Sequence, residues 1–219
     1  MMEPSAITAE EFTLFRRLIY KNAGISLNES KKVLLVGRLA RRLQVYEFSS
    51  FSQYYRMLAS GQHPDEVQTM VDLLSTNETY FFREPKHFDF LRDEIIARHK
   101  APGSFRVWSA ASSSGEEIYT LAMVLADSMG GAAWEVVGSD ISTRVLEKAA
   151  SGHYSLARTE GIPPGFLQKY CLKGIRSQAG TFKIIPDLRK RTRFHLINLT
   201  QPIRADIGEF EVIFLRNVM

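Results

Sequence analysis

The chain has 219 residues, of which 45% are hydrophobic and 24% are charged, a composition typical of soluble globular proteins. This composition excludes a disordered chain, and the single cysteine, Cys171, excludes a disulfide-stapled scaffold. The net charge of +4 indicates an acidic partner, and the lack of a secretory signal or an apolar run of about 18 residues predicts a cytoplasmic protein without direct membrane insertion.

Residues 1–75 are predicted to form an all-helical domain, because apolar residues recur at helical spacing and no period-2 stretch indicates a strand. Thr8 and Glu11 form a capping box at the first helix start, and Gly24 is suited to end that helix in a left-handed conformation. Capping signals predict further helices at about 30–46, from the Ser50 and Gln53 pair onward, and at about 64–74.

Residues 105–219 are predicted to form an α/β domain, because short apolar runs alternate there with helical patterns, as in a parallel sheet with crossover helices. Strands are expected at 105–110, 134–138, 193–198 and 211–215, and helices at 116–129 and 142–151. Residues 76–104 are expected to link the two domains. A small antiparallel β insert is expected at about 173–193.

The most informative segment is a strand that opens into small residues at 110–115, followed by two acids at a helix start. Small side chains let a ligand lie against the backbone, so this loop predicts an adenosine cofactor. Glu116 and Glu117 would repel a pyrophosphate at the helix N-terminus and favour a cationic ligand. Stabilisation of the helix dipole explains the two glutamates equally well.

Two further segments carry candidate cofactor contacts. Asp140 ends the second predicted strand, where a carboxylate can accept both ribose hydroxyls, although it could instead serve as the N-cap of the next helix. Asn77, Thr79 and Arg83 surround an aromatic trio at 80–82. This connector could close over a cofactor, or it could be an ordinary interdomain linker.

In this order, the motifs resemble the CheR family of chemotaxis receptor methyltransferases, over essentially the whole chain. The resemblance rests on five segments: TNETYFFRE at 76–84 with His87-Phe88, VWSAASSSGEEIY at 107–119, GSDIS at 138–142, Asn198-Leu199, and VIFLRNVM at 212–219. Two positions depart from the family pattern. Ile118 stands where a proline is usual, and Ser112 stands where a cysteine is common.

The resemblance implies a class I methyltransferase domain of Rossmann-like fold after the helical domain. It implies transfer of a methyl group from S-adenosylmethionine to glutamate side chains of chemoreceptors, giving methyl esters and S-adenosylhomocysteine. Carried over by position, the cofactor contacts fall on Asn77, Thr79, Arg83, Glu117, Asp140, Asn198, Leu199, Arg216 and Asn217.

The chemistry implied by the resemblance needs no general base, because a glutamate with a pKa of about 4.3 is ionised at neutral pH. Arg83 is the candidate catalytic residue, since its guanidinium could fork onto a carboxylate of the substrate or the cofactor. The alternative for Arg83 is a salt bridge with Glu78 or Glu84.

The second predicted helix carries a basic stripe beside its apolar face, made by Lys31, Arg38, Arg41 and Arg42. The resemblance implies that this domain docks the cytoplasmic helices of the receptor, whereas a solvated surface explains the stripe without a partner. In some family members the β insert holds a peptide from the receptor C-terminus, and here it could equally shield the cofactor. The sequence indicates neither a metal site nor a nucleic-acid surface.

A non-catalytic signalling module that binds S-adenosylmethionine or its product is the alternative function. A nicotinamide dehydrogenase is disfavoured by the acidic helix start. Methyltransferase sheets of this class normally have seven strands, whereas four are predicted here, and the chain stops inside the last motif. We therefore expect a C-terminally truncated domain, with the edge strands and a tyrosine-containing continuation of that motif beyond Met219.

Overall fold

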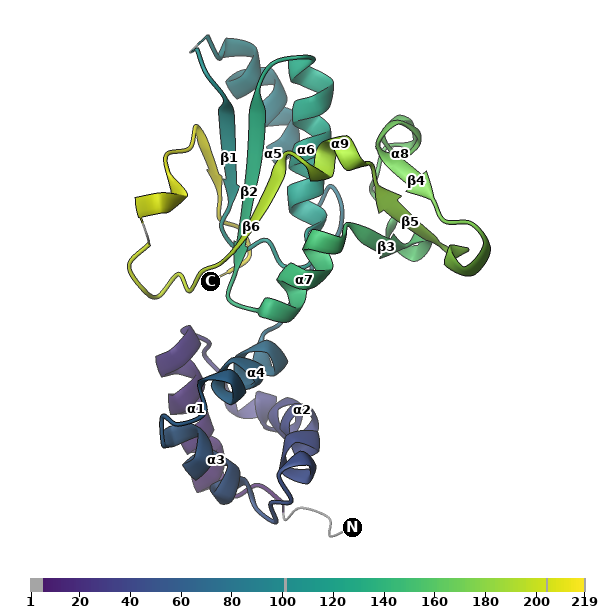
Figure 1. The fold of residues 1–219 in the computed structure, drawn as a ribbon. Coiled ribbons are helices and arrows are strands. Elements are labelled where there is room, and N and C mark those ends of the chain that lie inside the picture. The colour runs from purple at the N-terminus through teal and green to yellow at the C-terminus, as the bar shows by residue number, and fades with distance from the viewer. Residues whose placement is uncertain (1–5, 101, 204, 219) are drawn as a thin grey trace. The chain divides into compact units, whose positions relative to one another are not determined.

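The computed structural model describes residues 6–100, 102–203 and 205–218 and divides the chain into two compact units, with the division after Thr76 (Figure 1). In the described residues, no helix has the length and apolar character needed to cross a membrane.

In the described part of the first unit there are four α-helices, and they begin close to where the capping signals predict. They are α1 (Ala9–Ala23), α2 (Lys32–Val45), α3 (Phe51–Ala59) and α4 (Pro64–Leu74), with a 3-10 turn at Glu29–Lys31 before α2. The expected capping box of Thr8 and Glu11 is present, and Gly24 ends α1 with a φ of 68°. The capping box at Ser50 is also present.

A buried carboxylate joins three of these helices. Glu66 on α4 is 5% exposed and accepts two hydrogen bonds from Arg42 on α2. It also accepts hydrogen bonds from the hydroxyls of Tyr46 (3.0 Å) and Tyr54 (2.6 Å). Burial by itself raises the pKa of Glu66, but these hydrogen bonds outweigh it and lower the pKa below the ordinary glutamate value.

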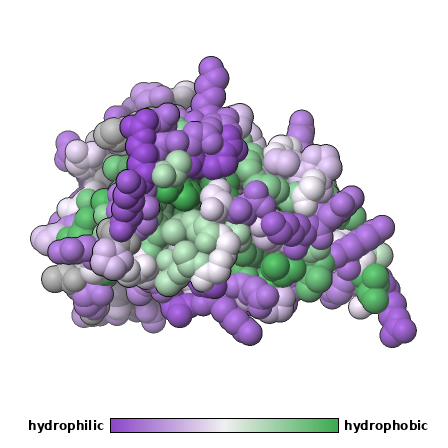
Figure 2. Space-filling model, turned by 90° about the horizontal axis from the view of Figure 1, so that it is seen from above, coloured by the Kyte–Doolittle hydropathy of each residue, from purple (hydrophilic) through white to green (hydrophobic). Residues whose placement is uncertain are grey.

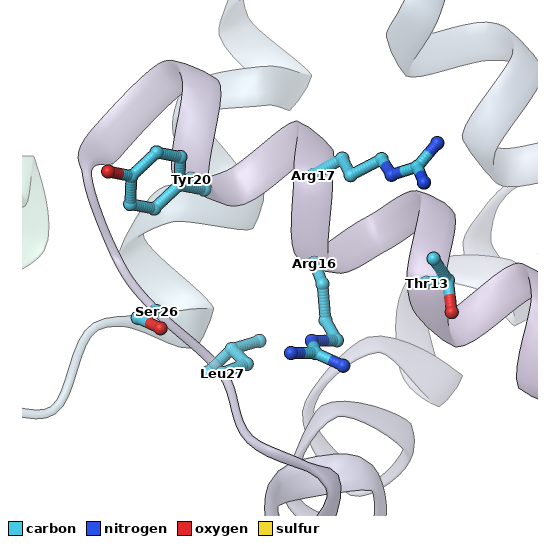
Figure 3. A pocket seen from close by; sticks show the side chains of 6 residues that line it. All are labelled: Thr13, Arg16, Arg17, Tyr20, Ser26 and Leu27. Atoms are coloured by element: carbon cyan, nitrogen blue, oxygen red, sulfur yellow. The ribbon is translucent and has the colours of Figure 1, made fainter.

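A hollow of about 290 Å³ lies on the first unit, between α1 and the segment that follows it (Figure 3). Its lining residues are Thr13, Arg16, Arg17, Tyr20, Ser26 and Leu27. Figure 3 shows the Leu27 side chain pointing toward the Arg16 side chain. An ion pair of 2.8 Å with Glu29 holds Arg16 in this position.

A four-stranded parallel sheet forms the centre of the second unit, as the alternating pattern predicts. Its strands are β1 (Phe105–Ser109), β2 (Trp134–Asp140), β6 (Thr192–Leu196) and β7 (Val212–Phe214), in the order β6-β2-β1-β7. Val107 of β1 pairs with Val136 on one side and Val212 on the other. The chain therefore builds outward from β1 through β2 to β6 and then returns to the opposite side of β1. The edge strands expected beyond residue 219 lie outside the described residues.

The crossover helices are α6 (Glu116–Met129) and α7 (Thr143–Ser151), and they follow β1 and β2 as expected. Residues 76–104, expected to be a linker, are largely folded into the second unit instead. They include α5 (Lys86–Phe90), a π-helical turn at Leu91–Ile95 and a 3-10 turn at Ile96–Arg98. Figure 1 shows α5 and α6 behind β1 and β2. Phe88 and Leu91 belong to the core, and the Phe88 ring stacks on Phe214 at 5.8 Å.

The antiparallel insert begins earlier in the chain than the expected range of 173–193. Its sheet has the order β3-β5-β4, from β3 (His153–Ser155), β4 (Cys171–Lys173) and β5 (Thr181–Ile184). Two short helices, α8 (Pro164–Tyr170) and α9 (Pro186–Arg189), and 3-10 turns at Leu156–Arg158 and Arg176–Gln178 accompany it. A three-residue strand such as β3 is too short to produce a recognisable alternation. A further 3-10 turn, Ala205–Ile207, lies between β6 and β7.

The insert extends to the right of the parallel sheet in Figure 1, and hydrophobic residues reach the surface on that side of the space-filling view (Figure 2). Leu172 on β4 is 53% exposed, and Ile175 in the next turn is 70% exposed.

Candidate functional site

The connection order of the parallel sheet marks one place for a ligand. Open parallel sheets bind ligands at the carboxyl ends of their strands, where the connections change direction. That change occurs between β1 and β7. The segments that follow the four strands at this edge are residues 110–115, 141–142, 197–201 and 215–218. The structure thus brings the small-residue loop, Asp140, Asn198 and Arg216 to one edge of the sheet.

The loop at 110–115 is held closely by its neighbours. The backbone N–H groups of Ala110 and Ser112 donate to the carbonyls of Phe214 and Ser139, both at 2.8 Å. Gly115 has a φ of 93°, and a Cβ there would lie 2.8 Å from the hydroxyl of Tyr154. The small residues therefore serve tight packing of the loop as well as access for a ligand.

Asp140 lies at the end of β2, where the sequence predicts a ribose contact. Its side chain is 8% exposed, and its two oxygens accept the backbone N–H groups of Ser113 (2.9 Å) and Ser142 (3.0 Å). The N-cap of α7 is Ser142, so the alternative role of Asp140 as N-cap is not what the structure shows. A carboxylate at this position is a chemical group suited to bind hydroxyl groups, since each of its oxygens can accept more than one hydrogen bond.

The two glutamates at the start of α6 have different surroundings. Glu117 is 15% exposed, accepts a hydrogen bond from the Ser109 hydroxyl (2.7 Å) and pairs with Arg216 (3.1 Å). Burial raises the pKa of Glu117, although Arg216 opposes that shift. Glu116 is fully buried and pairs with Arg158 at 3.1 Å. Only Glu117 remains a candidate for direct contact with a cationic ligand.

Arg216 connects the last strand to the segment before α5. Its Nη2 donates to the carbonyl of Arg83 (2.6 Å) and to the carboxylate of Glu84 (3.1 Å), while Nη1 reaches Glu117. The Asn217 amide also approaches Glu84, at 3.5 Å. The family resemblance implies that Arg216 and Asn217 contact the cofactor, and in the structure both also tie residues 83–84 to the sheet.

The Arg83 side chain pairs with neither Glu78 nor Glu84 through their carboxylates in the described structure. Its Nη1 donates to the backbone carbonyl of Glu78 (2.8 Å), and the guanidinium lies 5.6 Å from the centre of the Tyr80 ring. The salt-bridge alternative is therefore not observed. Most N–H groups of Arg83 remain available for a ligand or substrate.

The other predicted cofactor residues are less uniform in their contacts. Among the described residues, the buried Nδ2 of Asn77 has no hydrogen-bond partner, whereas the backbone carbonyl of Thr79 accepts from Arg158 (2.8 Å). The side-chain oxygen of Asn198 accepts from the backbone N–H and the hydroxyl of Thr200. Leu199 packs on the cluster around Trp108.

These groups fit a positively charged adenosine derivative. The carboxylate of Asp140 is of the type that accepts hydrogen bonds from hydroxyl groups, and Glu117 carries a second carboxylate at this edge of the sheet. In the described part of the chain, the buried side-chain oxygens of Ser112 and Ser113 and the amide of Asn77 have no protein partner. Because unpaired buried polar groups are costly, a polar ligand that pairs them would stabilise the site.

The basic stripe on α2 is smaller than predicted. Arg42 is committed to Glu66, and Arg38 donates to the carbonyls of Leu73 and Ser75, both at 2.9 Å, at the C-terminal end of α4. Two of the four cations therefore hold the helical unit together. Lys31 and Arg41 remain exposed.

Comparison with known proteins agrees with the motifs. The all-alpha domain model of CheR methyltransferases matches residues 10–75, and the SAM-binding domain model of the same family matches residues 77–219. The chain is 41% identical to the chemotaxis protein methyltransferase of Escherichia coli and 39% identical to that of Salmonella typhimurium, over all of this chain and 76% of each relative. The chemotaxis protein methyltransferase 2 of Pseudomonas aeruginosa is 39% identical over 97% of this chain and 76% of its own length. The chain therefore belongs to the CheR methyltransferase family, and S-adenosylmethionine is the methyl donor that it binds.

Proposed function

We propose that this protein is a protein-glutamate O-methyltransferase that acts on the cytoplasmic helical domain of chemoreceptors and thereby serves chemotaxis adaptation. The observation that carries the proposal is the extent of the similarity. The sequence identity to chemotaxis protein methyltransferases extends over both the helical first unit and the second unit, which contains the parallel sheet. The products would be glutamate methyl esters and S-adenosylhomocysteine.

The cofactor contacts are proposed from the site geometry and the family motifs together. Asp140 would hold the ribose, and Glu117 would face the positively charged part of the cofactor. The other proposed contacts are Asn77, Thr79, Arg83, Asn198, Leu199, Arg216 and Asn217. When bound, the cofactor supplies a methyl group activated by a positively charged sulfur.

The proposed chemistry asks this chain for orientation and not for proton transfer. A substrate carboxylate is already ionised at neutral pH, so no side chain has to remove a proton. Arg83 keeps donors that can hold one carboxylate oxygen while the other points toward the methyl group. Orientation of this kind can lower a barrier by about 7–11 kcal/mol in favourable cases.

Receptor docking is proposed for the exposed face of α2 and the 3-10 turn before it, through Arg41 on the helix and Lys31 at the end of the turn. Positive side chains on a helix surface can attract an acidic receptor helix and raise the rate of encounter. The insert is a second proposed contact, for a peptide at the receptor C-terminus. Exposed apolar residues on and after β4, such as Leu172 and Ile175, support that role.

The proposal is tested by incubating the full chain with S-adenosylmethionine labelled in its methyl group and purified receptor cytoplasmic fragments. We expect label in the receptor that is released as methanol by mild base, because esters hydrolyse and methylated amines do not. Arg83→Ala should abolish most of the transfer. Binding of S-adenosylhomocysteine without any transfer would contradict the proposal and favour a non-catalytic signalling module.

A further inference from the structure

A fully buried carboxylate lies next to the cofactor loop and is not needed to contact the cofactor. Glu116 is in the first turn of α6 and has no exposed surface. One of its oxygens accepts the hydroxyl of Ser114 (2.6 Å), and the other pairs with Nη1 of Arg158 (3.1 Å). A carboxylate buried this deeply depends on such partners, because ionisation without them is unfavourable.

The partner comes from the antiparallel insert. Arg158 ends the 3-10 turn Leu156–Arg158, directly after β3. The same Nη1 atom also donates to the backbone carbonyl of Thr79 at 2.8 Å. One guanidinium group of the insert thus connects the start of α6 with the segment at 77–83. These are two of the segments to which cofactor contacts are assigned above.

Other contacts show that the insert packs closely on both segments. The Tyr154 hydroxyl on β3 donates to the carbonyl of Ser114 at 2.8 Å. After the 3-10 turn, Gly161 has a φ of 90°, and a Cβ there would lie 2.6 Å from the carbonyl oxygen of Phe81. Small displacements of the insert would therefore move the cofactor loop and the segment before α5.

We propose that Arg158 is a positioning residue for cofactor binding, which acts through the buried Glu116 and the Thr79 carbonyl. The insert then has a role in every catalytic cycle, whether or not it binds a peptide. The inference rests on the assignment of cofactor contacts to residues 77–83 and 110–117. Without the guanidinium, the two segments lose their shared donor and the Glu116 carboxylate loses its cation.

The test measures the affinity of the purified full chain for S-adenosylhomocysteine by calorimetry. Arg158→Ala leaves a buried charge unpaired and can unfold the protein, so the main variant is the double substitution Glu116→Gln with Arg158→Met. We expect its affinity to fall by about tenfold, because small errors in position are costly at such sites. The single variant Arg158→Lys should keep most of the original affinity. Its ammonium group can donate to both the Thr79 carbonyl oxygen and a carboxylate oxygen of Glu116.

The matched control is Lys169→Ala, which removes another ion pair of the insert, 2.8 Å long to Asp127. Thermal unfolding without ligand is recorded for every variant. Affinity of the double variant within about twofold of the original protein would overturn the proposal. An equal loss of affinity in the control would overturn it too. The binding measurement contains no methyl acceptor, so a failure of glutamate methylation would not affect its result. In the same way, an unchanged affinity in the double variant would not contradict the proposed methylation of glutamate.

Discussion

Glu117→Gln is expected to weaken cofactor binding without weakening the fold. The Glu117 side chain is 15% exposed and lies between the Ser109 hydroxyl and the Arg216 guanidinium. Burial raises the pKa of this carboxyl, which means that the folded protein disfavours its ionised form. The neutral amide keeps the shape of the side chain and removes that cost. Arg216 keeps its contacts with Arg83 and Glu84.

The size of the effect follows from the charge of the ligand. A hydrogen bond to a charged group contributes about 1.5–3 kcal/mol, which corresponds to about ten- to a hundredfold in affinity. Partial exposure of Glu117 allows some screening by solvent, so we expect a loss near the lower end of that range. Folding stability at neutral pH should stay the same or rise slightly.

The same carboxyl gives cofactor binding a defined pH dependence. Its pKa in the folded protein lies above the ordinary value of 4.5, so affinity for a cationic ligand falls as the pH drops through that raised pKa. Folding stability changes in the opposite sense. At pH values between the ordinary and the raised pKa, the native state binds more protons than the unfolded state. The contribution of Glu117 to the free energy of unfolding therefore falls as the pH rises through this range. Glu117→Gln should remove both dependences.

Calorimetric titration with S-adenosylhomocysteine, from mildly acidic to neutral pH, measures the affinity, and urea unfolding measures the stability. The control is Glu135→Gln, which removes the charge of a partly buried ion pair with Arg106 (3.2 Å) near the start of β2, at the opposite end of that strand from Asp140. Unchanged affinity in Glu117→Gln, or an equal loss in the control, would refute the role assigned to Glu117.

Glu66→Ala should lower the free energy of unfolding of the helical unit by about 3 kcal/mol in urea titrations, because it leaves the partly buried guanidinium of Arg42 without its carboxylate partner. Since the pKa of Glu66 is lowered, its contribution is present above the ordinary pKa and is lost on acidification, so this deficit should shrink in acid. Gly138→Ala should lower the free energy of unfolding by about 1–3 kcal/mol in the same titrations, since its Cβ would lie 1.9 Å from the buried side chain of Ile118. In the control Gly131→Ala the added Cβ meets nothing within 4 Å, so the free energy of unfolding should not change. Reversing the charges of Lys31 and Arg41 should raise the KM for receptor fragments at low salt and leave S-adenosylhomocysteine affinity unchanged; an unchanged KM would argue against docking on α2.

Sequence patterns predicted much of the fold because the signals that specify it are local. The capping boxes at Thr8 and Ser50 involve residues three positions apart, and both are present in the structure. The four parallel strands were predicted from short apolar runs, and each is found close to its expected range. The CheR motifs identified the family and its cofactor from the order of short segments.

The boundaries of the insert and the fate of the expected linker were not predicted. Strands as short as β3 carry too few residues for alternation to be recognised. The segment around Phe88 is polar on one side and has only one helical turn before its π-helical turn, so its place in the core depends on Phe214 and other distant partners.

The roles of the individual charges were decided by tertiary structure. Arg42 binds Glu66, and Arg38 donates to a carbonyl at the C-terminal end of α4. Two of the four cations in the predicted docking stripe therefore stabilise the helical unit. Neighbouring residues on a helix point about 100° apart, which indicates that Glu116 and Glu117 face different surroundings but not which surroundings they face. Sequence alone therefore determined the family, the order of the elements and the cofactor. Only packing between segments far apart in the chain decided that Glu116 is held by Arg158 and that Glu117 pairs with Arg216, because long-range contacts leave no periodic signal in the sequence.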